Sequence, residues 1–153
     1  MIQRFYAAFA ARDADAMVAN YAPDVRFWDP VFLELRAPEA AGMWRMLAGR
    51  ATDLTVELLE HEATEANGSA RWRAHYTFTQ TGRPVVNDVR AQFRFADGLI
   101  VDHRDEFDLT RWTRQALGPV GLFLGWTPVV RHGVQRRAKA GLTQFLTRGE
   151  QVS

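Results

Sequence analysis

The stretch Tyr21-Ala-Pro-Asp-Val-Arg-Phe-Trp-Asp29-Pro30 is the most informative part of this sequence. It places one carboxylate, that of Asp29, among the aromatic residues Phe27, Trp28 and Phe32. A carboxylate among rings is hydrogen-bonded, exposed or shifted towards its neutral form, and in the last case it can act as an acid or base near neutral pH. The plainer alternative is a turn aspartate, before a proline, that hydrogen-bonds the local backbone.

Helical patterns flank this stretch on both sides. Residues 2–11 carry an apolar face at helical spacing, and Asp13 is suited to cap a second helix that runs to Asn20. After a turn, residues 25–29 alternate briefly and predict a short strand. Pro38 suits the first turn of a third helix, for which Gly49 is the expected stop.

From residue 53 to residue 109 the apolar period changes to two, which predicts four strands. Three turn sequences separate these strands: Asn67-Gly68, Gly82-Arg83-Pro84 and Asp97-Gly98. Three helices followed by a four-stranded antiparallel meander predict the α+β class.

Alternation within these strands predicts which side chains share the inner face. In the last strand Val101, His103 and Asp105 point the same way. An imidazole beside a carboxylate can relay a proton or orient a water molecule. Tyr76 and Asn87 share the inner face of neighbouring strands and can bind a carbonyl or position water. His103 and Asp105 can instead lie at a solvent-filled opening, or His103 can be an interior histidine with satisfied hydrogen bonds. Tyr76 and Asn87 can equally be ordinary polar residues of the core.

Composition limits the classes of function. The 153 residues, 47% of them apolar, are enough for one domain with an appendage, and the net charge of +1 gives no field that would favour nucleic acid. There is no Cys, and the four His residues show no metal-ligand spacing, so neither a metal nor a cofactor is expected. The first residues do not resemble a signal peptide, and the longest apolar run, residues 120–126, is too short to span a bilayer. A cytoplasmic protein is expected.

The order of these segments is similar to a known family. The chain resembles the nuclear-transport-factor-2-like superfamily, in particular its SnoaL-like and ketosteroid-isomerase-like branches. The shared order is two helices, the Tyr21–Pro30 stretch, a helix and a meander that ends Asp97-Gly-Leu-Ile-Val-Asp-His-Arg-Asp105. The resemblance covers about residues 2–109. It implies a cone, in which a curved antiparallel sheet wraps the N-terminal helices around a hollow, and a homodimer formed through the convex sheet face. Members include steroid isomerases, polyketide cyclases, epoxide hydrolases, dehydratases and non-catalytic modules, so the fold alone does not settle the activity.

The resemblance transfers only some of the isomerase residues. Asp29 occupies the place of the general base. Phe5 and Ala91 occupy the places of the two oxyanion donors and carry no donor, so steroid isomerisation by that set is not expected. Asp88 and Arg90 match part of the epoxide hydrolase set, but the alternation turns them to the outer face.

The predicted organisation is a cone-shaped α+β domain over residues 1–110 and a C-terminal helical extension over residues 111–153. The apolar segment 117–128 is too hydrophobic for an exposed linker, so it is expected to pack on the cone, on a partner subunit or at the pocket entrance. Its glycines at 118, 121 and 125 can act as lid hinges. Attachment of the basic final helix to a membrane surface is an alternative, but its basic residues form no clean polar face, so no membrane partner is expected.

The sequence therefore predicts a SnoaL-like enzyme that performs cofactor-independent acid/base chemistry on a small apolar substrate, of the isomerase, cyclase, dehydratase or epoxide hydrolase type. Asp29 is the predicted base, and His103 with Asp105 is the predicted acid or water-orienting pair. The predicted substrate contacts are polar and aromatic residues of the interior: Tyr76, Asn87, Phe5, Trp28, Trp44, Trp72, Phe93 and Phe107. The alternatives are a protein that binds an apolar ligand without turnover and a dimeric interaction module.

Overall fold

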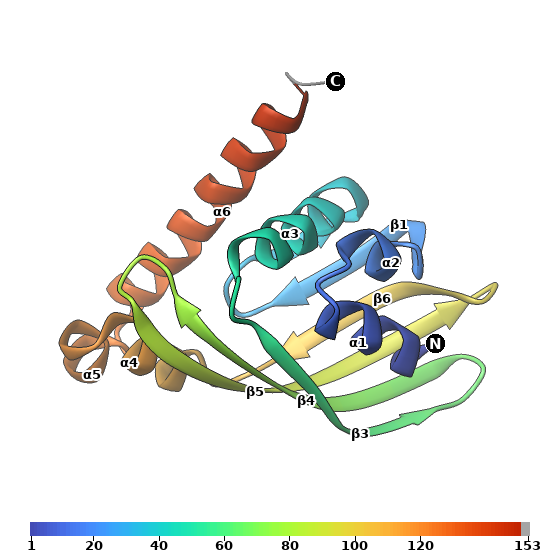
Figure 1. Ribbon diagram of the computed structural model, residues 1–153, viewed down its shortest axis with the longest axis horizontal. Helices are drawn as coiled ribbons and strands as arrows, with labels where there is room; N and C mark the ends of the chain where they lie inside the picture. Colours follow the sequence, from blue (N-terminus) through green and yellow to red (C-terminus); the bar gives the residue numbers. More distant parts are fainter. Residues whose placement is uncertain (151–153) are drawn as a thin grey trace.

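A computed structural model describes residues 1–150. These residues form one curved, open sheet of six strands with helices over its concave side (Figure 1). The arrangement confirms the predicted α+β class and the cone-like architecture.

The N-terminal helices are α1 (Ile2–Ala10), α2 (Ala14–Val18) and α3 (Ala37–Arg50). Asp13 caps α2 as predicted, because its Oδ1 accepts a hydrogen bond of 2.9 Å from the backbone N–H of Ala16. The prediction that α2 reaches Asn20 was wrong, since the Asn20 amide instead donates to carbonyls in the last turn of the helix. The prediction that α3 stops at Gly49 was also wrong by one residue.

The strands are β1 (Tyr21–Asp29), β2 (Leu33–Arg36), β3 (Thr55–Ala63), β4 (Asn67–Phe78), β5 (Arg83–Ala96) and β6 (Leu99–Glu106). Their order is β2-β1-β6-β5-β4-β3, and β1 runs parallel to β6 while the other neighbours are antiparallel. The predicted meander is therefore four strands of a six-stranded sheet. Pro23 lies inside β1 rather than in a turn, where the β1–β6 register shifts between Tyr21 and Arg26.

The alternation in β6 is interrupted once. The register shifts so that Phe95 pairs with Ile100 while Arg94 pairs with Asp102, which leaves Val101 as the extra residue of a bulge. Ile100 is therefore fully buried, and Val101, predicted to face inward, is only half-buried. Beyond the bulge, His103 and Asp105 face inward as the alternation predicts.

The C-terminal helices are α4 (Leu109–Leu117), α5 (Pro119–Leu124) and α6 (Pro128–Glu150). Helix α4 packs on β5, α5 packs on α4, and α6 packs on α3. Figure 1 shows α6 as a long helix that leaves the sheet beside α3. Among the helices described, none combines the length and the apolar composition that a membrane span requires.

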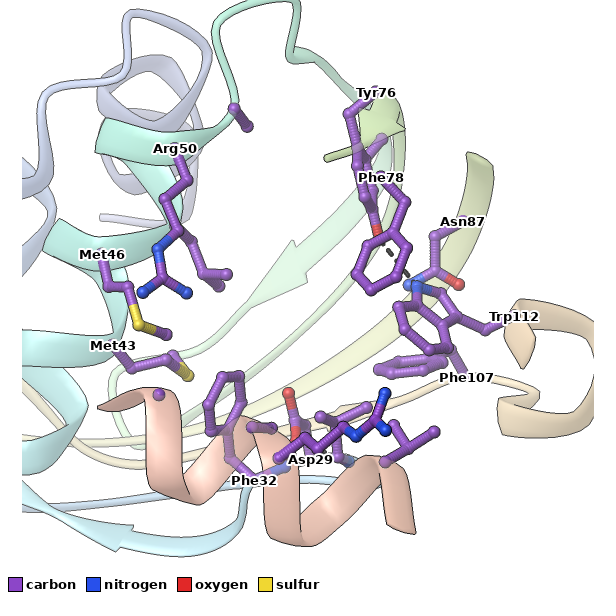
Figure 2. Close-up of a pocket in the computed structure, with 18 of the residues that line it drawn as sticks. Asp29, Phe32, Met43, Met46, Arg50, Tyr76, Phe78, Asn87, Phe107 and Trp112 are labelled. Atoms are coloured by element: carbon purple, nitrogen blue, oxygen red, sulfur yellow. Dashed lines mark hydrogen bonds between the residues drawn. The ribbon is translucent and has the colours of Figure 1, made fainter. Parts of the chain in front are cut away.

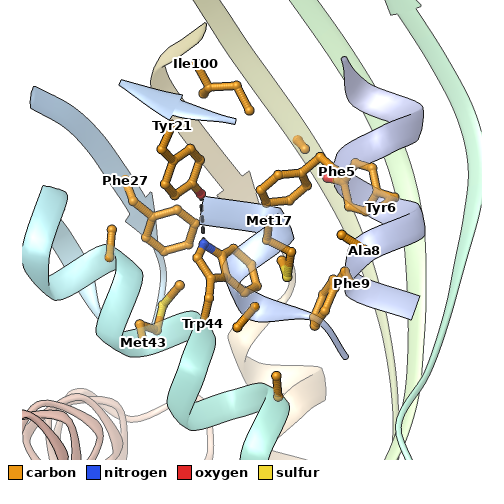
Figure 3. Packing of buried hydrophobic residues seen from close by; sticks show 14 of the residues in the cluster. Phe5, Tyr6, Ala8, Phe9, Met17, Tyr21, Phe27, Met43, Trp44 and Ile100 are labelled. Atoms are coloured by element: carbon orange, nitrogen blue, oxygen red, sulfur yellow. Dashed lines mark hydrogen bonds between the residues drawn. The ribbon is translucent and has the colours of Figure 1, made fainter. Parts of the chain in front are cut away.

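The main core lies between the concave face of the sheet and the N-terminal helices. Phe5 from α1, Phe27 from β1 and Trp44 from α3 meet there edge to face, with Phe5 and Phe27 each between 5 and 6 Å from the Trp44 ring (Figure 3). Because these residues come from three segments, the core holds α1 and α3 against the strands that carry the candidate site.

Candidate active site

A cavity of about 590 Å³ lies between the concave sheet face, α3 and the C-terminal helices (Figure 2). Asp29 from the end of β1 and Asp105 from β6 both line it. The rest of the wall is mostly apolar and aromatic and includes Phe32, Met43, Trp44, Trp72, Val89, Phe107, Trp112 and Val134. Two carboxylates thus share one largely apolar space.

The two oxygens of the Asp29 side chain have different environments. Oδ1 accepts hydrogen bonds from the backbone N–H groups of Val31 at 2.8 Å and Phe32 at 2.6 Å. Oδ2 has no hydrogen-bond partner within residues 1–150. Burial raises the pKa of Asp29 to about 7, with the negative charge of Asp105 adding to the rise and the two backbone donors opposing it. Asp29 therefore both accepts hydrogen bonds from the backbone of the turn and lines the cavity.

Asp105 ends a chain of buried hydrogen bonds. Trp44 Nε1 donates to the Tyr21 hydroxyl at 2.8 Å, the Tyr21 hydroxyl lies 2.7 Å from His103 Nδ1, and His103 Nε2 lies 3.0 Å from Asp105 Oδ1. His103 and Asp105 are 1% and 3% exposed. Figure 3 shows the Trp44–Tyr21 bond within the core.

For a neutral His103, one tautomer satisfies every hydrogen bond of this chain. Tyr21 oxygen accepts the Trp44 proton, so its own proton is directed at His103 Nδ1. The remaining ring proton then sits on Nε2 and is donated to Asp105. In that arrangement every donor of the chain points towards the Asp105 carboxylate.

Two further polar groups of the wall are Tyr76 and Asn87 (Figure 2). The Tyr76 hydroxyl accepts a hydrogen bond of 2.7 Å from Trp112 Nε1, so its own proton is available to a ligand. Burial raises the pKa of Tyr76, and the charge of Asp29 adds to this, so the phenol keeps that proton. The Trp112 contact also ties α4 to the sheet.

Two buried donors lack a hydrogen-bond acceptor among the described residues: the hydroxyl of Tyr6 and Nε1 of Trp72. Their rings are 5.6 Å apart, and the Trp72 ring lines the cavity. Burial raises the pKa of Tyr6, and Asp105 adds to the rise. Of the two residues only Trp72 lines the cavity, so the Tyr6 hydroxyl is a donor of the core without an acceptor in the described residues.

The cavity rim carries charge as well. Arg50 from α3 and Arg137 from α6 both line it, are exposed, and have no carboxylate partner in the described part of the chain. Figure 2 shows the Arg50 guanidinium beside Met46. The rim can therefore hold a polar or anionic end of an otherwise apolar molecule.

The structure brings seven of the predicted site residues to the cavity wall: Asp29, Asp105, Tyr76, Asn87, Trp44, Trp72 and Phe107. His103 lies behind Asp105, and Phe5 and Phe93 pack on the His103 ring with centroid distances of 5.4 and 4.3 Å. These three are core residues that support the site from behind rather than wall residues.

Trp28 lies away from the predicted site. It follows Phe27 in β1, so alternation turns it to the opposite face of the sheet, where the Arg104 guanidinium stands 4.0 Å above its ring. The aromatic cluster of the sequence is thus divided between the two faces, with Phe27 inside and Trp28 outside.

Sequence reasoning missed Tyr21, Trp112 and Arg50. Tyr21 needs the parallel pairing of β1 with β6 to reach His103, and no local pattern predicts that pairing. Trp112 lies in the C-terminal extension, beyond the strands whose alternation predicts the inner face, and reaches the cavity through the packing of α4. In residues 1–150, no group of three His, Cys, Asp or Glu side chains is arranged to hold a metal ion.

Comparison with known proteins agrees with the fold. Among solved structures, the chain is similar to a ketosteroid-isomerase-like protein from Catenulispora acidiphila (TM-score 0.68, 14% identity, covering 83% of this chain and 96% of that one). It is also similar to an LEH-like epoxide hydrolase from M. tuberculosis (TM-score 0.64, 24% identity, 79% of this chain and 90% of that one covered). A candidate polyketide cyclase from Xanthomonas campestris gives a TM-score of 0.63 at 23% identity, with 74% and 92% covered.

At these identities the solved structures establish the fold alone. No functionally curated protein matches the sequence. The model of the SnoaL-like domain matches residues 2–103, which span α1 to the buried histidine of β6. The chain therefore belongs to the SnoaL-like domain family, as its helix and strand order predicts.

Proposed function

We propose that the protein is an enzyme that moves protons on a small apolar carbonyl compound held in the cavity, without a cofactor. The observation that supports this most is the pair of carboxylates in one cavity with different surroundings. Asp105 Oδ1 lies 3.0 Å from His103 Nε2 at the end of the hydrogen-bond chain, whereas Asp29 accepts from two backbone N–H groups and burial raises its pKa to about 7. Enzymes commonly use two titratable groups in different environments, one as the acid and the other as the base.

The proposed roles follow from these surroundings. Asp105 takes a proton from the carbon next to the carbonyl, the electron pair of that C–H bond forms the C=C bond, and the carbonyl oxygen takes the proton of Asp29. Asp105 then returns its proton to the same or another carbon, the C=O bond re-forms, and the enol oxygen gives its proton back to Asp29, which restores both carboxyl groups. His103 and Tyr21 position Asp105, and the Tyr76 hydroxyl supplies a further hydrogen bond. This assignment makes Asp105 the base, where the sequence favours Asp29.

The test is deuterium incorporation into a panel of hydrophobic ketones in D₂O, followed by mass spectrometry. Asp105→Asn is expected to lower the exchange rate by roughly 10²- to 10⁴-fold. Asp88→Asn is the matched control, because Asp88 is paired with Arg73 at 2.7 Å outside the cavity. Exchange that is unchanged in Asp105→Asn removes Asp105 from the mechanism.

The pH profile tests the role of Asp29 separately. If Asp29 donates a proton, the rate falls as the pH rises above about 7, where its carboxyl ionises. In Asp29→Asn this fall is expected to disappear and the remaining rate to be low. If the rate of the Asp29→Asn variant still falls above pH 7 as in the wild type, another group is responsible for the titration.

A second candidate function is the binding of an apolar ligand without turnover. It is favoured by Phe5 and Ala91, which are buried apolar residues at the positions where the family resemblance puts the isomerase donors. Ketones that raise the melting temperature but gain no deuterium would support this candidate.

A further inference from the structure

Helix α5 has an inverted distribution of side chains. Its small residue Gly121, and Gly125 just after it, are buried against α4, where an added Cβ would overlap the Thr113 carbonyl and hydroxyl oxygens respectively. The large apolar side chains point outward instead. An ordinary surface helix buries its apolar residues and exposes its polar ones.

This outward face contains most of the exposed large hydrophobic surface in residues 1–150. Six of the seven large hydrophobic side chains that are exposed lie within ten residues, and we refer to them as the apolar patch: Val120 55%, Leu122 55%, Phe123 70%, Leu124 49%, Trp126 64% and Val129 79% exposed. Contiguous apolar surface of this kind marks a contact with a protein or a membrane.

The charge of the segment that contains the apolar patch has one sign only. Residues 109–149 contain seven basic side chains and no Asp or Glu, so all eighteen acidic residues of the chain lie outside this segment. The basic residues are Arg111, Arg114, Arg131, Arg136, Arg137, Lys139 and Arg148. In the described part of the chain only Arg111 has an ion-pair partner, Asp88 at 3.8 Å. Arg114 and Arg131 flank the apolar patch in the chain, and an apolar patch flanked by unpaired cations is complementary to an anionic surface.

We propose that the apolar patch docks on an anionic lipid bilayer. Phe123 and Trp126 would enter the interface between headgroups and acyl chains, and the arginines of α4 and α6 would bind lipid phosphates. A second copy of the chain fits less well, because a two-fold contact through this face brings two sets of cations together with no carboxylate between them. In this proposal the segment that enters the bilayer is α5 with its junction to α6. The distribution of side chains along α6 alone therefore does not predict membrane binding.

The apolar patch is continuous with the cavity. Val120 belongs to both. Leu117, which precedes the patch in the chain, and Val130, which follows it, also line the cavity. Docking would therefore bring the cavity wall next to the bilayer, from which an apolar substrate can enter. This consequence rests on the proposed function, whereas the docking itself does not.

The test is sedimentation of the full chain with large unilamellar vesicles of phosphatidylcholine, with and without phosphatidylglycerol. Binding is expected only with phosphatidylglycerol and is expected to weaken as salt rises. Phe123→Ser with Trp126→Ser should weaken binding by about a hundredfold or more. Phe145→Ser, an exposed aromatic of α6 outside the patch, is the control and should bind as wild type.

Charge and insertion are checked with separate variants. Arg131→Gln with Arg136→Gln should weaken vesicle binding roughly tenfold or more, whereas the same change at Arg36 and Arg45 should not. Vesicles should shift the wild-type tryptophan emission to shorter wavelength, and Trp126→Phe should remove most of that shift while retaining binding. Absence of binding, equal binding by the Phe123/Trp126 variant, or a dimer in light scattering that this variant abolishes would overturn the proposal.

Discussion

At the scale of single residues, Asp29 links stability to pH. Its folded-state pKa of about 7 is above the ordinary value of 3.8, so between these limits the folded protein holds a proton that the unfolded chain has released. The free energy of unfolding therefore falls as the pH rises from about 4 to about 7. With one unit of pKa equal to about 1.4 kcal/mol, this group alone accounts for at most roughly 4 kcal/mol.

Asp29→Asn tests this linkage. The asparagine oxygen can still accept from Val31 and Phe32, but it carries no charge at any of these pH values. The variant should be as stable as wild type near pH 4 and more stable near pH 8, by urea unfolding at each pH. Equal stability of the two proteins at both pH values would contradict the raised pKa.

Two buried tyrosines allow a matched comparison at the same scale. Tyr21→Phe removes the acceptor of Trp44 Nε1 and the donor to His103, and is expected to lower the free energy of unfolding by about 1–3 kcal/mol. Tyr6→Phe removes a buried hydroxyl that has no partner in the described residues, and is expected to be neutral or stabilising. Denaturant unfolding of both variants measures the difference, and equal losses would contradict the hydrogen-bond chain.

At the scale of elements, the glycines of α5 act in packing. The sequence suggests lid hinges at Gly118, Gly121 and Gly125, and Gly118 does have a positive φ of 63°. Gly121 and Gly125 instead let α5 approach Thr113 of α4 more closely than any side chain would allow. The close contact opposes independent movement of α5, and so supports a fixed platform rather than a moving lid.

Gly121→Ala should therefore displace α5 from α4. We expect a loss of about 1–3 kcal/mol, or local release of α5, because the new methyl group meets backbone that cannot move aside. Gly49→Ala in α3 meets no atom within 4 Å and should instead stabilise by up to about 1 kcal/mol. Thermal unfolding and amide hydrogen exchange of α5 distinguish these outcomes, and wild-type exchange in Gly121→Ala would contradict the packing role.

At the scale of the whole molecule, the cavity needs both segments of the chain. The sheet supplies the carboxylates, and α4 and α6 supply Trp112, Val134 and part of the rim. The division of the chain into a cone-shaped domain and an extension at residue 110 stays a proposal. The Trp112–Tyr76 hydrogen bond and the packing of Leu142 in the main core join the two parts.

The homodimer also stays a prediction. We expect light scattering to give twice the chain mass of 17.4 kDa, with the contact through the convex sheet face that the family resemblance implies. A dimer through that face would leave the apolar patch free, because the patch belongs to helices beyond the sheet. A monomer at all concentrations would contradict the prediction.

Local patterns in the sequence determined much of this protein. Short-range features of the sequence set the order of the helices and strands: the change in the spacing of apolar residues from helical to every second residue, the Asp97–Gly98 turn and the Asp13 cap. They can do so because backbone geometry repeats over a few residues. The same alternation put His103 and Asp105 on the inner face, and the Tyr21–Pro30 stretch identified Asp29 as the carboxylate beside aromatic rings.

Only the tertiary structure decided which distant residues meet. Parallel pairing of β1 with β6 brings Tyr21 to His103, packing of α4 brings Trp112 to Tyr76, and close approach at Thr113 turns the apolar side of α5 outward. The physical reason is that burial and contact depend on the joint packing of segments far apart in the chain. Such packing raises the pKa of Asp29 and exposes Trp126, and no local periodicity encodes either result.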